Sequence, residues 1–418
     1  MREVVVTGLG IVSPIGVGVD DCWAALEGGV SGVRVVPELA AAGHPIPIAG
    51  EVVNFEPKQY VKPRKALKVM SRETQLGFSA AELAWEQAAL EGAGIAPERL
   101  GVLCGSNMFC PELPELAAAF NACRDGDGAF DENMWGPASM AEMFPLWLLK
   151  YLPNMVPAHI GIAHDLRGPS NSVVAGDTSG LLAVIESADI IARGAADVML
   201  AGGVSSMLGM MDMMWHAGAR LSRRIDEPAR ASRPFDANRD GTVGAEGAAI
   251  LVLETREHAA ARGVTALATL HGHGRTCEPS ADAHQPTGRA IAAAISAALQ
   301  SSQLSPSDVG VVVAQGTSTQ LEDRIEAAAI TETLGETPVT ALKSYLGNAG
   351  AGAGAIELAL AIVAARKGVV PATLNYDTPD PACPVNVSAK PRSLAAPTMV
   401  AINHRITGQA VALAASVD

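Results

Sequence analysis

The sequence has few aromatic and few charged residues for its size. Aromatic side chains make up 4% of the 418 residues and charged ones 18%, whereas hydrophobic residues make up 49%. The interior must therefore be built from Ala, Val, Leu, Ile and Met, and the sparse charge indicates a large subunit interface. The length allows two ordinary domains, or one large pseudo-symmetric unit with a sizeable core.

Several kinds of site and segment are missing. The six cysteines form no CxxC pair, so neither a zinc site nor a disulfide framework is expected, and a reducing, cytoplasmic location follows. The nine histidines are scattered, and His271-Gly272-His273 has no further ligands at metal spacing, so we expect no metal and no cofactor. The N-terminus lacks the apolar region of a signal peptide, and no run of about 20 apolar residues predicts a membrane span.

The charge balance limits the partners. A formal net charge of -14 repels a phosphate backbone, so nucleic acid is excluded as a partner. An acidic surface also suits an acidic carrier protein poorly, unless a local basic patch serves for docking. Such a patch is either a docking site or an ordinary solvated face. Its residues are Lys58, Lys62, Arg64, Lys65 and Lys68.

Short β-branched runs alternate with longer alanine-rich stretches, which predicts an α/β fold with buried strands. The alternation restarts after Glu254 without a linker, so we expect two similar halves, residues 1–254 and 255–418, around one core. The segment 106–157 breaks the pattern and is predicted to be an insertion. The expected strands are 3–7, 99–104, 172–175, 197–201, 248–253, 266–271, 309–315, 398–402 and 410–415. The expected helices are 72–91, 178–192, 288–301, 322–334 and 353–366.

The opening run from Val4 to Gly16 has Gly8 and Gly10 after a strand, as a dinucleotide-binding turn would, but the third glycine is missing. Nucleotide binding is therefore not expected. Three later segments indicate a particular protein family more specifically. They do so together with the opening run and with SRPFDANRDGTVGAEGAAILVLE from Ser232. They are GPSNSVVAGDTSG from Gly168, VVAQGTSTQLEDRIE from Val312 and ALKSYLGNAGAGAGAIE from Ala341.

These segments closely resemble the elongating β-ketoacyl-acyl-carrier-protein synthases, ketosynthases of the thiolase superfamily, in the right order over nearly the whole chain. The resemblance implies a thiolase fold: two pseudo-symmetric βαβ halves in five layers, dimeric, with the active site where the halves meet. It also implies a nucleophile turn, in which a cysteine stands between a strand and a helix N-terminus that would lower a thiol's pKa and bind an oxyanion.

The three positions that hold the family's Cys, His and His are occupied here by Asp177, Gln315 and Asn348. A carboxylate cannot carry an acyl group as a thiolate does, because an anhydride is far more labile than a thioester. Amides can donate a hydrogen bond to a carbonyl, but near neutral pH they cannot exchange a proton as a histidine can. Asp177 is interpreted either as a helix N-cap or as a base or plug of the pocket.

Other residues match or depart from the family pattern. Lys343, Asp323 and Glu326 match it, which favours loops retained as structure, and a Lys343–Asp177 ion pair is an open alternative. The family's glycine-rich gate is replaced by NHRITGQAVAL from Asn403, where His404 is either structural or a new catalyst. The methionine-rich segment 207–222 is interpreted as core, pocket lining or dimer seam.

The family includes a class without the catalytic residues, the chain-length factors of type II polyketide synthases, which pair with an active ketosynthase. They commonly carry glutamine in place of the cysteine, so Asp177 departs from that pattern. The leading hypothesis is a chain-length-factor-like subunit in polyketide or fatty-acid-type biosynthesis, whose partners are an active ketosynthase, an acyl carrier protein and an acyl or polyketide chain. The alternatives are an enzyme of different chemistry, which cyclises, hydrolyses or condenses a thioester without acylation, and a homodimeric acyl-binding protein.

Overall fold

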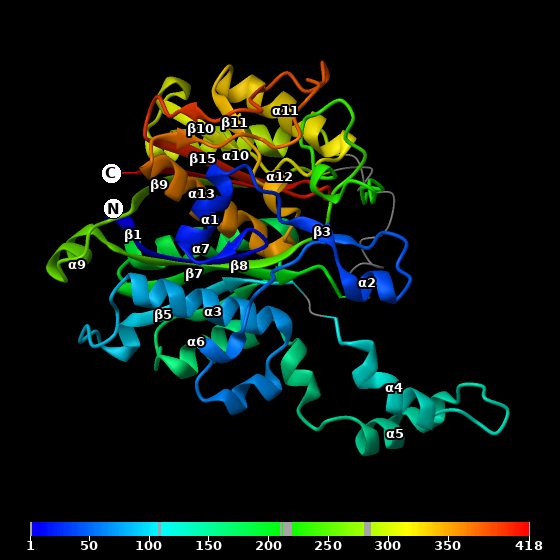
Figure 1. Cartoon of the computed structure of the whole chain (residues 1–418). Coiled ribbons are helices and arrows are strands. Elements are labelled where there is room, and N and C mark those ends of the chain that lie inside the picture. The colour runs from blue at the N-terminus through cyan, green and yellow to red at the C-terminus, as the bar shows by residue number, and fades with distance from the viewer. Residues whose placement is uncertain (1, 108–109, 210, 212–219, 280–285, 418) are drawn as a thin grey trace.

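The computed structural model describes residues 2–107, 110–209, 211, 220–279 and 286–417. Two sets of strands join into one mixed sheet where β1 (Val4–Ser13) pairs with β9 (Ala268–Cys277) (Figure 1). From β1 outward the first set is β8 (Glu246–Thr255), β7 (Val198–Ser206), β5 (Leu100–Gly105) and β6 (Ser170–Val173). From β9 outward the second set is β16 (Gln409–Ser416), β15 (Thr398–His404), β10 (Val309–Val313), β11 (Pro338–Thr340) and β13 (Asn386–Val387).

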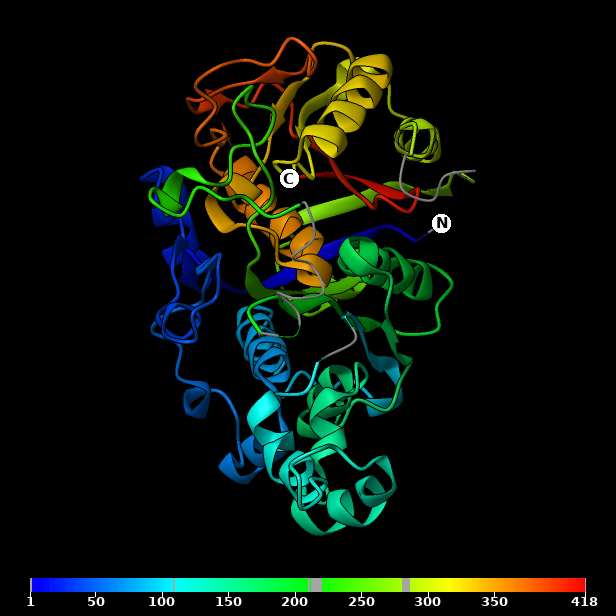
Figure 2. The same cartoon turned by 90° about the vertical axis from the view of Figure 1, so that its right-hand side faces the viewer.

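The two sets repeat one topology. β8 is antiparallel to both of its neighbours, as is β16, and both sets continue with parallel pairs. Helices fill the layers on either side (Figure 2). α3 (Arg72–Gln87) and α6 (Met155–Ala163) cover one outer face, and α10 (Arg289–Ser302) and α11 (Gln320–Leu334) cover the other. α7 (Ser179–Ala192) and α13 (Ala353–Arg366) lie between the two sets, so the predicted five-layer α/β fold is confirmed.

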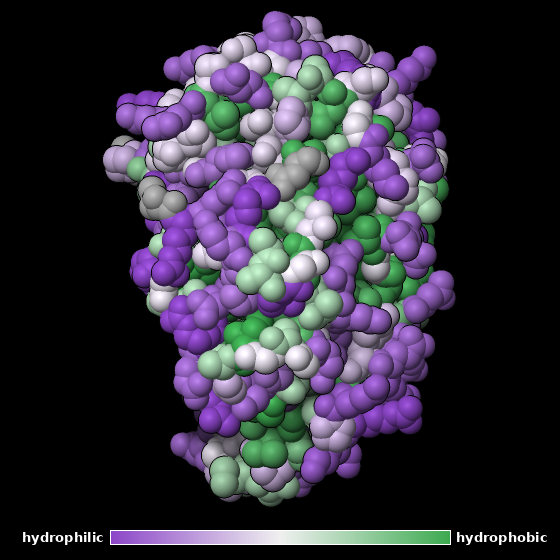
Figure 3. Space-filling view, turned by 90° about the vertical axis from the view of Figure 1, so that its left-hand side faces the viewer, coloured by the Kyte–Doolittle hydropathy of each residue, from purple (hydrophilic) through white to green (hydrophobic). Residues whose placement is uncertain are grey.

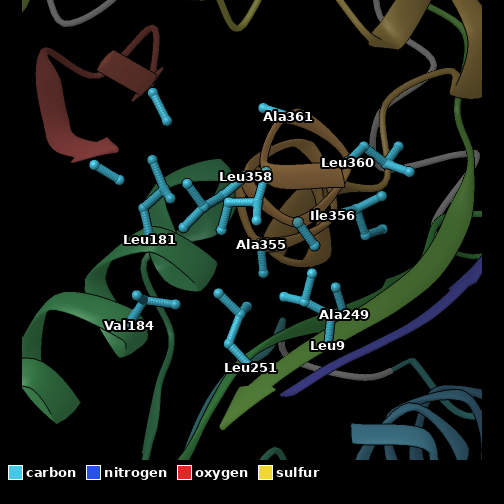
Figure 4. Packing of buried hydrophobic residues seen from close by; sticks show 14 of the residues in the cluster. Leu9, Leu181, Val184, Ala249, Leu251, Ala355, Ile356, Leu358, Leu360 and Ala361 are labelled. Atoms are coloured by element: carbon cyan, nitrogen blue, oxygen red, sulfur yellow. The ribbon is translucent and has the colours of Figure 1, made fainter. Parts of the chain in front are cut away.

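The central layer shows why these sequences become buried helices. Every residue of α13 from Ala353 to Ala365 is buried, and a helix that is apolar all round belongs in an interior. Figure 4 shows Leu181 and Val184 of α7 and Leu358 of α13 gathered above Leu251 of β8. The layer that holds the second half against the first is thus made of Ala, Leu, Ile and Val, as the composition predicts.

Glycine lets α3 approach β1 closely. A methyl group built on Gly10 would collide with the carbonyl oxygen of Ala80, and one on Gly8 would lie 2.5 Å from the carbonyl oxygen of Ala84. Both glycines lie inside a ten-residue strand, and not in a turn. The predicted strand 3–7 was therefore too short, because helix contact and not turn formation requires these glycines.

Most other expected elements are present within one to six residues of their predicted ends. The helix expected over 72–91 stops at Gln87, because Ala89 takes a left-handed φ of 49°. The predicted division between residues 254 and 255 stays a prediction. Of the methionine-rich segment 207–222, residues 210 and 212–219 lie outside the described residues.

The segment 106–157 extends away from the body as an arm that carries α4 (Leu113–Ala122) and α5 (Trp135–Glu142) (Figure 1). Its small cluster has Phe120 with ring centroids 4.9 Å from Trp135 and 5.8 Å from Phe130. Exposed hydrophobic side chains continue along it: Phe120, Phe130, Met134, Met140, Phe144, Leu146 and Leu148. The face in Figure 3, by contrast, carries its hydrophobic residues in separate patches between hydrophilic ones. Among the described helices, none is long and apolar enough to cross a membrane.

Candidate functional site

Asp177 lies in a tight turn between β6 and α7. The turn is a single 3-10 turn, Gly176–Thr178, and Gly176 has a φ of 58°. The helix N-cap is Thr178, whose hydroxyl donates to the Ala175 carbonyl (2.9 Å), while the Ser179 hydroxyl accepts from the Ala175 N–H (2.8 Å). The N-cap interpretation of Asp177 is therefore wrong. Its half-buried carboxylate accepts no hydrogen bond from the described part of the chain, so it remains available to a ligand.

Gln315 follows β10 and is fully buried. Its side-chain carbonyl accepts the backbone N–H of His404, whereas its Nε2 has no hydrogen-bond partner. The backbone N–H groups of Gln315 and Gly316 donate to the Glu326 carboxylate at 2.7 and 2.8 Å. Gln315 thus connects the loop after β10 to the end of β15, and it retains one free donor.

Asn348 is almost fully buried just after α12 (Lys343–Leu346). Its Oδ1 accepts the N–H of Gly350 at 3.1 Å, and its backbone bonds to Val243 and Ala245. The short turn Gly350–Gly352 packs against the Asp177 turn. Asn348 therefore belongs to the same site, where its carbonyl holds a backbone turn.

Lys343 forms a buried ion pair with Glu357 of α13. Its Nζ lies 2.5 Å from Glu357 Oε1, and Asn403 Nδ2 donates to Glu357 Oε2 at 3.1 Å. Burial raises the pKa of the Glu357 carboxyl to about 7, although Lys343 and Asn403 act in the opposite direction. The alternative of a Lys343–Asp177 pair is wrong, because the ammonium is already paired with a different carboxylate.

His404 lies at the end of β15 and is buried with only 3% of its surface exposed. Its Nε2 is 3.7 Å from Glu326 Oε2, which is too long for a good hydrogen bond. Burial lowers the pKa of this imidazole, but the carboxylates of Glu326 and Glu322 outweigh burial and the net shift is upward. Glu322 is in turn paired with Arg220, and burial raises its pKa.

Asp323 lies in α11, as Glu322 and Glu326 do, and its role is structural. Its carboxylate accepts the N–H groups of Phe235 (2.9 Å) and Ser318 (3.0 Å), and Arg239 Nε lies 3.5 Å away. Burial nevertheless raises its pKa to about 7. Together with Glu326 it fixes the loop between β10 and α11, as expected of loops retained as structure.

Arg405 belongs to the site, although the sequence indicated it only as part of the rebuilt gate loop with His404 and Ile406. A methyl group built on Gly176 would lie 2.5 Å from Arg405 Nε and 2.7 Å from its Cζ, so the guanidinium covers the turn that presents Asp177. The rebuilt gate loop around His404 was a signal for this region. Glu322, Glu357 and Arg220 were missed, since nothing in their spacing reveals their partners.

This arrangement lacks a nucleophilic sulfur. Burial raises the pKa of the Cys22, Cys104 and Cys383 thiols to about 12. A thiolate is the reactive form, so none of these substitutes for a cysteine at position 177. No group of three or more metal-ligating side chains is found among the described residues either. The site therefore offers hydrogen-bonding groups, the half-buried carboxylate of Asp177, and the His404 imidazole, whose pKa is raised by the nearby carboxylates.

A cavity of about 860 Å³ lies elsewhere in the first half, between α2 (Pro37–Ala41), the start of α3 and the base of the arm. It touches none of the predicted catalytic residues, but Leu208, Gly209 and Met211 line it, so part of the methionine-rich segment does line a pocket. Four of its charged groups are already paired, Arg72 with Glu246 at 2.7 Å and Lys150 with Glu115. Size alone therefore does not make it the functional site.

Comparison with known proteins agrees with this geometry. Residues 1–259 match the model of the beta-ketoacyl synthase N-terminal domain and residues 267–377 match that of the C-terminal domain. A 3-oxoacyl-[acyl-carrier-protein] synthase 2 of Coxiella burnetii is 34% identical over 91% of this chain and 90% of its own length. The tetracenomycin polyketide synthase ketoacyl synthase alpha subunit of Streptomyces glaucescens is 33% identical, over 91% and 89%.

Three solved structures share the fold over all of this chain. A beta-ketoacyl synthase from Burkholderia phymatum superposes with a TM-score of 0.90 at 30% identity over 100% of its own chain. The ishigamide ketosynthase/chain length factor gives 0.87 at 27% over 99%. A type II polyketide synthase acyl-carrier protein in complex with its ketosynthase bound to the hexaketide gives 0.84 at 28% over 99%.

Proposed function

Since this chain belongs to the β-ketoacyl synthase family, we propose that it is a non-condensing member that pairs with an active ketosynthase and influences the chain which the pair makes. The observation that carries the proposal is the turn before α7. It presents the carboxylate of Asp177 and contacts two segments that amides hold in place, the turn Gly350–Gly352 held by Asn348 and the end of β15 held by Gln315. Condensation through an acyl-enzyme needs a thiolate, which this trio lacks, and proton transfer at the two histidine positions, where the amides of Gln315 and Asn348 cannot perform it.

An open sheet edge favours pairing with a second ketosynthase-like chain. β6 ends the sheet, pairs with β5 alone among the described strands, and leaves Ser170 and Asn171 exposed. Unpaired edge strands are templates for a strand from another chain. The apolar arm around α4 and α5 adds hydrophobic surface of the kind that interfaces bury. One related structure is named as a ketosynthase/chain length factor, a pairing of this kind.

An acyl carrier protein is the proposed second partner. The side chains of the basic patch, residues 58, 62, 64, 65 and 68, are all exposed. Four of them lie on two 3-10 segments, Pro57–Gln59 and Arg64–Val69, and Lys62 lies between these segments. Only Lys58 has an ion-pair partner in the described chain, Glu56 at 3.8 Å. A related ketosynthase structure contains a bound acyl-carrier protein. Exposed, mostly unpaired cations are what docking of an acidic protein requires.

The experiment is co-expression with the ketosynthase encoded nearest to this chain, followed by measurement of complex mass in solution. We expect a 1:1 complex, and after incubation with acyl-loaded carrier protein, intact mass spectrometry should find the acyl group on the partner alone. A monodisperse homodimer that ignores the partner would contradict pairing and favour a homodimeric acyl-binding protein. An acyl adduct on Asp177 would contradict the non-condensing role.

A matched pair of variants localises the interface. The Ser172 N–H is accepted by the Asn171 side chain at 2.8 Å, so it faces away from the ladder with β5. Ser172→Pro removes this edge donor, whereas Ser172→Ala keeps it. We expect the proline variant to lose the complex and the alanine variant to retain it, both with the unfolding midpoint of the unaltered chain. Equal complex formation by both variants would place the interface elsewhere.

A second candidate function rests on His404. An imidazole held beside Glu326 and Glu322, with its pKa shifted upward, can donate a proton, as in cyclisation, hydrolysis or non-acylating condensation of a thioester. The test is incubation with a β-ketoacyl thioester. Release of free thiol or of a cyclised product, abolished by His404→Gln, would support an enzymatic role over that of a non-condensing subunit. Unchanged substrate after prolonged incubation would exclude it.

A further inference from the structure

The cavity at the base of the arm is distinct from the site around Asp177. Its volume is about 860 Å³, and small-molecule pockets usually measure about 300–1,000 Å³. Its walls come from α2, from the start of α3 and from both ends of the arm. Several apolar side chains line it: Val36, Leu39, Val52, Phe55, Met70, Leu113 and Leu208. The cavity therefore has the size and the surface to hold the apolar part of a small molecule.

The charged lining of this cavity is mostly acidic. Among the described residues that line it there are six carboxylates and two cations, which leaves a formal charge of -4. The carboxylates are Glu38, Glu51, Glu73, Glu112, Glu115 and Glu246, and the cations are Arg72 and Lys150. A cleft lined by charges of one sign concentrates the electric field within it. An anionic ligand would therefore be repelled from this cavity, and a cationic ligand would be attracted.

The two cations are already occupied by two of the carboxylates. Arg72 donates to both oxygens of Glu246, at 3.0 and 2.7 Å, and to the Val52 carbonyl at 2.9 Å. Lys150 pairs with Glu115, which also accepts the hydroxyl of Tyr151 at 2.7 Å. Each of these pairs is neutral as a whole. The negative charge of the cavity therefore comes from the remaining carboxylates.

Glu51 is the carboxylate whose position in this wall is best defined. The next residue, Val52, is fixed because its N–H donates to Glu246 at 3.0 Å. The half-buried carboxylate of Glu51 itself has no hydrogen-bond or ion-pair partner in the described part of the chain. Burial raises the pKa of Glu51, the carboxylates of Glu38 and Glu246 add to this rise, and two nearby arginines oppose it. A bound cation would relieve both the burial and the repulsion.

We propose that this cavity binds an organic cation, an ammonium group carried on an apolar chain, with Glu51 as its main counter-charge. Glu38 and Glu112 are exposed and also lack ion-pair partners within the described chain, so they add negative charge at the rim. A metal ion fits less well, because no three metal-ligating side chains converge among the described residues. The ammonium would receive charge-assisted hydrogen bonds, and the apolar walls would cover its chain. This site is separate from the one that carries the proposed function.

The test is calorimetric titration of the full chain near pH 7.5 with three eight-carbon probes, octylammonium, 1-octanol and octanoate. One charge-assisted hydrogen bond predicts roughly tenfold tighter binding of octylammonium than of octanol. We expect no binding heat from octanoate at concentrations at which octylammonium saturates the site. Glu51→Gln should weaken octylammonium about tenfold and leave octanol unchanged. The matched control is Glu257→Gln, at an exposed position on α9 (Arg256–Ala261), and it should bind as the unaltered chain does.

Three results would each overturn the proposal: equal affinity for octylammonium and octanol, tighter binding of octanoate than of octylammonium, or equal losses in Glu51→Gln and Glu257→Gln. Unfolding midpoints of the variants are measured on the same samples. If Glu51→Gln lowers the midpoint, Glu112→Gln at the exposed rim decides. A loss of about threefold in its affinity for octylammonium supports the proposal, and an unchanged affinity overturns it.

Discussion

The buried pair of Lys343 and Glu357 provides a direct test of whether the retained loops are structural. Their charged atoms lie 2.5 Å apart, and both side chains are at most 2% exposed. Removing one partner leaves an uncompensated buried charge, which costs about 3–5 kcal/mol, whereas replacing both by apolar residues of similar volume is often neutral. We therefore expect Lys343→Met and Glu357→Gln each to destabilise the chain, and Lys343→Met with Glu357→Leu to cost much less than their sum.

The size of the effect follows from the length of the chain. For 418 residues the unfolding entropy is roughly 0.9 kcal/mol/K, so 3–5 kcal/mol lowers the unfolding midpoint by about 3–6 °C. The matched control is Arg99–Asp197, a 2.6 Å pair whose side chains are each 34% exposed. Breaking such a pair costs at most about 1 kcal/mol, or roughly 1 °C. Scanning calorimetry of all the variants at one protein concentration measures these shifts.

The dependence on pH adds a second readout. The folded-state pKa of Glu357, about 7, is above its unfolded value, so this carboxyl favours folding at low pH and loses that contribution as pH rises towards 7. Lys343 lowers this pKa, so Lys343→Met raises it further and extends the loss above pH 7. We expect the midpoint of this variant to fall more than that of the unaltered chain between pH 7 and 8. Parallel pH profiles, or additive single and double variants, would refute the reasoning.

Three further predictions concern function. Asp177→Cys alone should neither condense nor decarboxylate malonyl-loaded carrier protein, because Gln315 and Asn348 still cannot transfer protons; turnover in a radiolabel assay would contradict this. Asp177→Asn should bind a malonyl thioester analogue more tightly, since two like charges about 4 Å apart repel by ~4 kcal/mol at an effective dielectric of about 20; unchanged calorimetric affinity would contradict charge exclusion. Reversing Lys65 and Lys68 to Glu should weaken carrier-protein binding at low salt, with Lys390→Glu as control; equal losses for both would exclude docking there.

The sequence predicts the fold well because burial and periodicity agree over most of the chain. The alanine-rich run of α13 has the predicted ends, residues 353 and 366, since its composition suits the interior on every side. The length of β1 was underestimated because, from the sequence alone, Gly8 and Gly10 fit a turn as well as a strand. Only the proximity of α3, which approaches from 70 residues further along the chain, shows why both are glycine.

The site was predicted less completely than the fold. Motif position found Asp177, Gln315 and Asn348, but ion pairing depends on geometry that no spacing encodes. An ion pair of Lys343 with Asp177 was considered, but Lys343 pairs with Glu357 in the second turn of α13. The helix cap falls on Thr178, one residue beyond the expected Asp177, because the 3-10 turn shifts the start of α7. Arg405 has its place only because Gly176 leaves room for a guanidinium.

At this site the family's catalytic side chains are replaced by other polar side chains, and not by apolar ones. The Gln315 side chain accepts the backbone N–H of His404. The His404 imidazole lies beside Glu326 and comes from the end of β15, whereas Gln315 and Asn348 lie in loops. Stability alone does not require buried carboxylates and a buried lysine at a site without function, since apolar residues of similar volume are often at least as stable. The unpaired donors of Gln315 and His404 impose a further cost on the folded chain. A ligand that paired with these atoms would offset that cost, so ligand titration tests this site more directly than a search for turnover.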